Sequence, residues 1–105
     1  MSDLIIHVDN TGKIVSSDRT VRLKKNLDQA TWNSQGLSGP WTIVFPSGPE
    51  PYVGSPFASS TFHVPRLGTV NSGPPLSTAS DISYKYEVRG PDGNITDDPE
   101  ILIEE

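Results

Sequence analysis

Apolar and polar residues alternate most regularly towards the C-terminal end of the chain. Residues 82–89, ISYKYEVR, place an apolar or aromatic side chain at every second position. This period of two is typical of a β-strand with one buried face and one face in water. The sequence PDGN at residues 91–94 follows directly, and proline, glycine and asparagine favour the dihedral angles of a turn.

Similar short apolar or alternating runs occur along the whole chain, separated by clusters of proline and glycine such as PSGPEP at residues 46–51. No stretch longer than ten residues has a helical period with suitable caps. The expected strands are Leu4 to Val8, Lys13 to Ser16, Thr20 to Lys24, Asp28 to Asn33, Trp41 to Phe45, Phe57 to Val64, Ile82 to Arg89 and Glu100 to Glu104. This spacing predicts an all-β fold, a Greek-key β-sandwich of about eight strands, over a single domain of residues 1–105.

Two connections follow from the same pattern. Asn10-Thr11-Gly12 favours a hairpin between the first two strands, because asparagine and glycine accept left-handed dihedral angles. Residues 65–81 contain few large apolar groups and are expected to cross the sandwich edge, with one short helical turn at Ser77 to Asp81.

The last strand, residues 100–104, is expected to pair antiparallel with residues 82–89. The intervening segment contains Pro91 and Gly93 and has no helical pattern, so it can reverse the chain but not provide a parallel crossover. We expect Ile101 and Ile103 to point into the core.

Composition excludes several classes of site. The 105 residues include no cysteine, which excludes disulfides, thiolate nucleophiles, cysteine-rich zinc sites and copper sites that need a thiolate. Thirteen acidic and eight basic residues give a net charge of -5, so there is no overall attraction for nucleic acid or an anionic membrane. The N-terminal residues lack the basic region and long apolar run of a secretory signal, so we expect a soluble, cytoplasmic protein.

Several of these segments together resemble the cupredoxins, copper proteins of the plastocyanin and azurin type. They are Ala30-Thr31-Trp32-Asn33, Pro40 to Phe45, Ser55-Pro56-Phe57 and Tyr84 to Val88, and they occur in the family's order along residues 4–104. The resemblance implies a cupredoxin-like sandwich.

The copper ligands that the family provides are missing from the matching positions. Trp41 stands where the resemblance implies a histidine ligand, and Val88 stands where it implies the cysteine. The loop from Arg89 to Asp98 contains neither histidine nor methionine, so we predict no metal and no cofactor. His7 and His63 alternate with apolar neighbours and are interpreted as surface residues. A metal-handling or electron-transfer protein with non-standard ligands is the alternative.

The aromatic residues divide into core and surface candidates. We predict that Trp32, Phe45, Phe62 and Tyr86 lie in the core, because each occupies an apolar position of an alternating strand. Trp41 and Tyr52 flank the proline-rich loop of residues 46–51. Either residue could anchor a partner on a stiff loop, or Trp41 could fill the space of the missing metal site. We predict that Trp41 and Tyr84 are both largely buried, with Trp41 near the end of the sandwich where a copper protein would hold its metal.

Four of the eight basic residues lie within seven positions, at Arg19, Arg22, Lys24 and Lys25. Arg22 and Lys24 share one face of their expected strand. They either protect a sheet edge or dock an acidic partner.

The remaining candidates are acidic or nucleophilic. Asp92, Asp97, Asp98 and Glu100 form an acidic group that lacks the spacing of a calcium loop and is interpreted as a solvated loop. No strained serine turn occurs, so we do not predict an enzyme, although a small enzyme is the third alternative. The leading prediction is a metal-free, cupredoxin-like binding or accessory module for an unknown protein partner in a bacterial system. Its candidate interaction surface comprises Trp41, Tyr52, Arg22 and Lys24.

Overall fold

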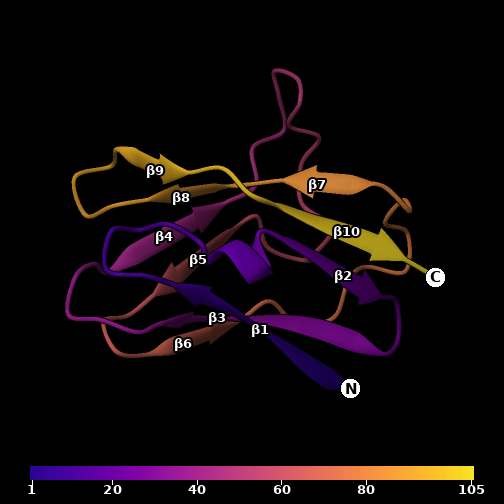
Figure 1. Ribbon diagram of the computed structural model, residues 1–105. Coiled ribbons are helices and arrows are strands. Elements are labelled where there is room, and N and C mark those ends of the chain that lie inside the picture. The colour runs from indigo at the N-terminus through magenta and orange to yellow at the C-terminus, as the bar shows by residue number, and fades with distance from the viewer.

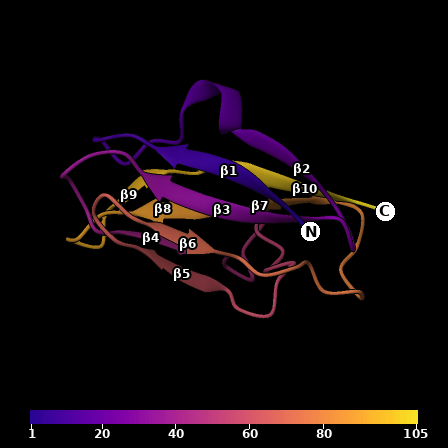
Figure 2. The same cartoon turned by 90° about the horizontal axis from the view of Figure 1, so that it is seen from below.

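The computed structural model describes all residues, 1–105, and is almost entirely β-structure. Figures 1 and 2 show its strands in two layers. The strands are β1 Ser2–Val8, β2 Thr20–Lys24, β3 Asp28–Ser34, β4 Trp41–Val44, β5 Thr61–Val64, β6 Thr69–Asn71, β7 Ser83–Lys85, β8 Glu87–Arg89, β9 Ile95–Asp97 and β10 Glu100–Glu104. A three-residue 3₁₀ turn, Ser16–Asp18, is the only helical segment, so no helix is long enough to cross a bilayer. The predicted all-β fold class is confirmed.

The first layer is the sheet with order β1-β3-β6. β1 pairs parallel with β3 along its whole length, from Ser2 opposite Asp28 to Val8 opposite Ser34. β6 pairs antiparallel with the other edge of β3.

The second layer contains the two remaining sheets, β2-β10-β7 and β5-β4-β8-β9. They are continuous, because only Tyr86 separates β7 from β8 and only Asp98 and Pro99 separate β9 from β10. The Tyr86 amide donates to the Pro99 carbonyl at 3.0 Å, a normal hydrogen-bond length. This bond keeps the two strand pairs joined. β10 pairs antiparallel with β7 and parallel with β2.

The core between the layers is built around an aromatic cluster. Trp32 from the first layer lies between rings of the second, with ring centroids 5.2 Å from Phe62 and 5.7 Å from Tyr86. Its indole Nε1 donates to the Tyr86 hydroxyl at 3.3 Å, so the one polar group of each ring is satisfied inside the core. The prediction that Trp32, Phe45, Phe62 and Tyr86 are core residues is confirmed.

The last strand also behaves as predicted. Ile101 and Ile103 are fully buried, and Glu100 lies opposite Lys85 in the antiparallel pairing with β7. The alternation did not predict the second partner of this strand, the parallel neighbour β2.

Other expected elements are shorter than predicted or absent. Residues 57–60 are not part of β5, because the Ser55 and Ser59 hydroxyls bond nearby backbone groups and turn the chain there. Residues 13–16 form only an isolated bridge between Ile14 and Val8, since the Ile14 amide donates to an Asp97 carboxylate instead of a neighbouring strand.

The connection at residues 65–81 contains β6, which was not predicted. Of the helical turn expected at 77–81, only one hydrogen-bonded turn at Ser77 and Thr78 forms, in which the Ala79 amide donates to the Leu76 carbonyl at 3.0 Å without a following helical bond. β9 was likewise missed within the predicted loop 90–99.

Candidate interaction surface

A proline-rich loop, residues 46–54, projects from the second layer between β4 and β5 (Figure 1). We refer to it as the proline loop. The Gly54 amide donates to the Pro46 carbonyl at 2.8 Å, and the Tyr52 amide donates to the Pro49 carbonyl at 3.1 Å. Gly48 and Gly54 have φ angles of 133° and 94°, which side chains other than hydrogen rarely allow. Together with three prolines, these features define one ordered loop conformation.

Tyr52 attaches the proline loop to the sheet beneath it. The side chain is half-buried, and the negative charges of Glu87 and Asp98 act on its hydroxyl. Partial burial, followed by these two negative charges, raises the pKa of Tyr52, so the phenol stays protonated and able to donate. Tyr52 is therefore mainly a support for the loop.

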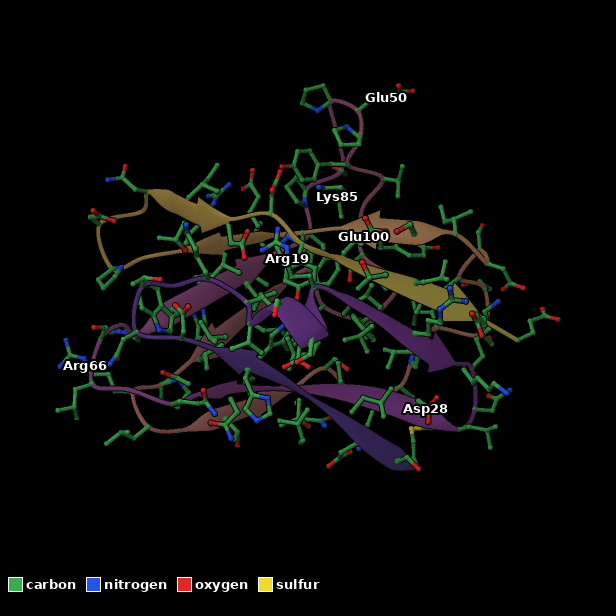
Figure 3. All side chains as sticks on the ribbon, viewed as in Figure 1. Arg19, Asp28, Glu50, Arg66, Lys85 and Glu100 are labelled. Atoms are coloured by element: carbon green, nitrogen blue, oxygen red, sulfur yellow. The ribbon has the colours of Figure 1, made fainter.

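The exposed part of the proline loop is its tip. Figure 3 shows Glu50 at the point furthest from the sheets, with Lys85 on the strand below the loop. Pro49, Glu50 and Pro51 are exposed, and the Val53 side chain is 50% exposed. The tip thus combines an apolar surface with one negative charge.

The sheet below the loop is covered with charges that neutralise one another. Arg89 contacts Glu87 Oε1 through Nε at 3.0 Å and through Nη2 at 2.5 Å. Lys85 Nζ lies 3.6 Å from Asp98 Oδ2, and the Ser83 hydroxyl donates to Glu100. Although Glu87 occupies the polar face of its strand, it is only 7% exposed. The alternation pattern placed Glu87 on the outer face and did not predict this burial.

Arg22 and Lys24 lie on β2, at the edge of the second layer. β10 and β7 separate β2 from the strands that carry the proline loop, so the fold does not bring these two residues together with Tyr52. Arg22 forms a 3.0 Å ion pair with Glu104, whereas the exposed Lys24 has no carboxylate within ion-pair distance.

The other two basic residues of residues 19–25, Arg19 and Lys25, form ion pairs. Arg19 Nη1 lies 2.5 Å from Asp97 Oδ2, and Lys25 Nζ lies 3.2 Å from Asp81. Burial alone would raise the pKa of Asp97, but hydrogen bonds from Arg19 and from the amides of Ile14 and Asp98 hold that pKa below its ordinary value. Asp97 therefore joins the second layer to the segment that follows β1.

Trp41 is buried, with 5% of its surface exposed, and Tyr84 is 6% exposed, as predicted for both. Trp41 packs beneath loops at one end of the sandwich. A Cβ at Gly12 would lie 2.6 Å from the indole ring, and one at Gly39 would lie 3.0 Å from its Nε1, so both positions need glycine. Trp41 lies under this end of the molecule and offers no exposed face to a partner.

The two positions where the resemblance implies copper ligands lie on adjacent strands. Ile43 is opposite Val88 in the pairing of β4 with β8, so Trp41 and Val88 both face the core, two residues apart in register. An indole and an isopropyl group supply no metal ligand there.

The remaining candidate ligands are dispersed. His7 is on β1, with Nδ1 3.0 Å from Asp18, whereas His63 is exposed on β5 in the other layer. No three His, Asp or Glu side chains are grouped so that they could hold a metal ion. In the acidic group of residues 92–100, each carboxylate has its own hydrogen-bond or ion-pair partner.

Comparisons of this chain with family models, with curated proteins and with solved structures find no match.

Proposed function

We propose that this chain is a metal-free, cupredoxin-like binding or accessory module that contacts a partner protein through the tip of the proline loop. The observation that carries this proposal is the combination of a projecting tip with an ordered base. The tip exposes Pro49, Glu50, Pro51 and Val53, while one backbone hydrogen bond closes the base, a second forms a turn within the tip, and Tyr52 is half-buried.

An ordered loop is suited to binding for an energetic reason. A flexible loop loses conformational entropy when a partner immobilises it, and each side chain that is fixed costs about 0.5 to 1.5 kcal/mol. Proline residues and internal hydrogen bonds reduce this loss before the partner arrives. Val53 and the proline rings then contribute apolar contact area.

Support for the cupredoxin-like part of the proposal comes from the segments on which the resemblance rests. Residues 30–33 lie in β3, 41–44 form β4, and 84–88 span β7 and β8, so all three segments are paired strands that line the core. A large indole at position 41 is consistent with a protein that fills, rather than uses, the position of a ligand.

The proposed partner is a protein rather than a nucleic acid or a membrane, and the proposed compartment is the cytoplasm. A net charge of -5 opposes binding to phosphate backbones or anionic lipid. The proposal includes no cofactor and no catalysis.

The test is affinity capture from the native cells with the immobilised full chain and two matched variants. Val53→Asp places a charge on the tip, and Leu67→Asp places the same charge on another exposed apolar residue, in a different loop. We expect a specific protein to be captured by the wild type and by Leu67→Asp, and to be lost with Val53→Asp. Calorimetry with the purified partner should give the same order. Equal capture by all three proteins would contradict the role of the tip.

The metal-handling alternative is tested separately. The chain is equilibrated with copper(II) or zinc, dialysed and analysed for bound metal. We expect no stoichiometric retention. Retention that is lost in both His7→Ala and His63→Ala would overturn the metal-free proposal.

A further inference from the structure

Edge strands expose main-chain groups, and this sandwich closes some of them from within the chain. On β2, the Lys24 amide donates to Asp28 Oδ2 at 2.9 Å, and the Lys24 carbonyl accepts from Leu27. On β5, the Ser59 hydroxyl accepts from the Thr61 amide at 3.3 Å and donates to the Thr61 carbonyl at 3.0 Å. β6 is only three residues long. Short or capped edges of this kind resist pairing with another chain.

β1 is the longest of these edge strands, and its outward-facing groups are also only partly closed. Ser2 and Val8 bond to residues flanking β3, which assigns the even-numbered residues of β1 to the ladder with β3. The odd-numbered residues Asp3, Ile5 and His7 therefore point their N–H and C=O groups away from it. Both outward groups of His7 are bonded: its amide donates to Asp18 Oδ2 at 2.8 Å, and its carbonyl accepts from the Val15 amide at 3.1 Å.

Asp3 and Ile5 have no such partners. Neither their amides nor their carbonyls bond to any other group outside the ladder that β1 forms with β3. Asp3 is exposed, and Ile5 is 41% exposed. Figure 1 shows the N-terminal half of β1, in indigo, running clear of β2. The result is an open edge two outward residues long, held straight by its complete pairing with β3.

The charges of the first layer indicate what kind of chain fits this edge. β1, β3 and β6 contain Asp3 and Asp28 but no lysine or arginine, and the one histidine is paired with Asp18. A second copy of this chain would place Asp3 near an identical carboxylate, which is unfavourable. A partner with a basic side chain opposite Asp3 and an apolar one opposite Ile5 would be favourable.

We propose that the β1 edge at Asp3 and Ile5 accepts an extended, basic and apolar segment of another protein as an additional antiparallel strand. Each of the two residues exchanges both backbone hydrogen bonds with the residue opposite, so the ladder contains four bonds. The added strand ends where His7 is closed by Asp18 and Val15. This edge lies on the opposite layer from the proline loop and is a second, independent binding surface.

The test uses the ¹⁵N-labelled full chain and a blocked heptapeptide, acetyl-Thr-Thr-Ile-Thr-Lys-Thr-Thr-amide. In the antiparallel register its isoleucine faces Ile5 and its lysine faces Asp3. We expect chemical-shift changes and slower hydrogen exchange at the Asp3 and Ile5 amides. A peptide with glutamate in place of lysine should bind about twofold to fivefold more weakly at low salt. A peptide N-methylated at its isoleucine, which removes a ladder donor, should cause neither change.

Two variants separate this surface from the proline loop. Ile5→Pro removes an outward amide at an edge position where proline is tolerated, and it should abolish binding. Val53→Asp should bind the peptide like the wild type, so failure of the proline-loop proposal leaves this one intact. Equal binding of the N-methylated peptide would overturn the inference. So would concentration-dependent self-association, without peptide, that protects the same two amides.

Discussion

The two layers of the sandwich share one core but carry different outer faces. On the first layer, neutral groups and one carboxylate bond to each other, as Gln29 does to Asp3 and Asn71 to Thr31. The strands of the second layer carry four acidic and four basic residues: Glu87, Asp97, Glu100, Glu104, Arg22, Lys24, Lys85 and Arg89. Most of these form ion pairs within the layer or with Arg19.

The difference shows that the charged side chains on an outer sheet face can be neutralised within the layer or left without a partner of opposite charge. Balanced ion pairs leave little net charge on the second layer, and the proline loop covers part of them. The first layer has no basic residue to neutralise its carboxylates, and its longest edge strand is partly open. We therefore expect the first layer to respond to a partner's charge more strongly than the second. The following variants test what joins the layers and what belongs to each.

The largest effect is expected where the layers meet at Tyr86. Tyr86→Ala removes a fully buried ring and leaves the Trp32 indole N–H unbonded, which should lower the free energy of unfolding by about 3 to 5 kcal/mol. Urea denaturation of the wild type and the variant measures this change. Lys85→Ala, next in sequence but on the outer face, should stay within about 0.5 kcal/mol. Equal effects would mean that Tyr86 does not join the layers.

Gly12 tests a second point of contact, where the turn after β1 touches Trp41 and Thr96 of the second layer. Gly12 has a left-handed φ of 80°, so Gly12→Ala should lower the free energy of unfolding by about 1 to 2 kcal/mol through backbone strain. The close approach to both side chains adds about 1 to 3 kcal/mol. Gly93 has a φ of 84° and no atom within 4 Å of the new Cβ, so Gly93→Ala should lose only the backbone contribution. Thermal and urea unfolding of both variants give the difference, and two equal losses would exclude the packing contribution.

Asp97 tests the electrostatic contact between the layers. Asp97→Asn should cost about 1 to 3 kcal/mol at pH 7, because Arg19 and two backbone amides bind the carboxylate. The folded pKa of Asp97 is lowered, so its contribution is fully present above the unfolded pKa near 4 and is lost as the pH falls through the folded pKa. The gap between wild type and variant should therefore close at acidic pH.

Asp98→Asn provides the control for that pH series, because it removes only an exposed partner of Lys85 and should cost no more than about 0.5 kcal/mol. A wild-type advantage over Asp97→Asn that is constant from pH 7 to pH 2 would contradict the assigned role of the carboxylate.

The smallest effect is expected on the outer face of the second layer itself. Arg22→Ala removes an exposed ion pair with Glu104 and should change stability by about 0.5 kcal/mol or less, with the difference decreasing as salt is added. Denaturation at two ionic strengths measures it. A larger, salt-independent loss would show that the second layer depends on its surface charges.

The sequence predicted those strands whose alternation is uninterrupted. The bounds of β2 and β10 agree with the expected ranges, and the buried faces of both were assigned from period-two spacing. β6 and β9 were missed because each has three residues and a single apolar one, which is too short for a period to be recognised. Alternation also cannot distinguish parallel from antiparallel partners, so the pairing of β1 with β3 was not predicted.

The candidate sites were predictable only where local chemistry determines them. The proline spacing at residues 46–51 indicated a stiff loop, and the burial of Trp41 was anticipated. The open edge at Asp3 and Ile5 had no local signal, because its extent is set by the bonds that Asp18 and Val15 form with His7. Such residues lie apart in the sequence, and alternation within one strand carries no information about the contacts between them that close an edge.

The parallel pairing of β2 with β10 has a consequence for the order of folding. Residues 20–24 find their ladder partner in residues 100–104, about eighty positions away. β10 also lies between β2 and β7, so the second layer cannot close until this late segment is available. Closing such a long loop costs entropy before any contact forms, and domains rich in non-local pairs fold in milliseconds to seconds. During synthesis the local hairpins can form early, but β2 must remain without its neighbour until β10 has left the ribosome.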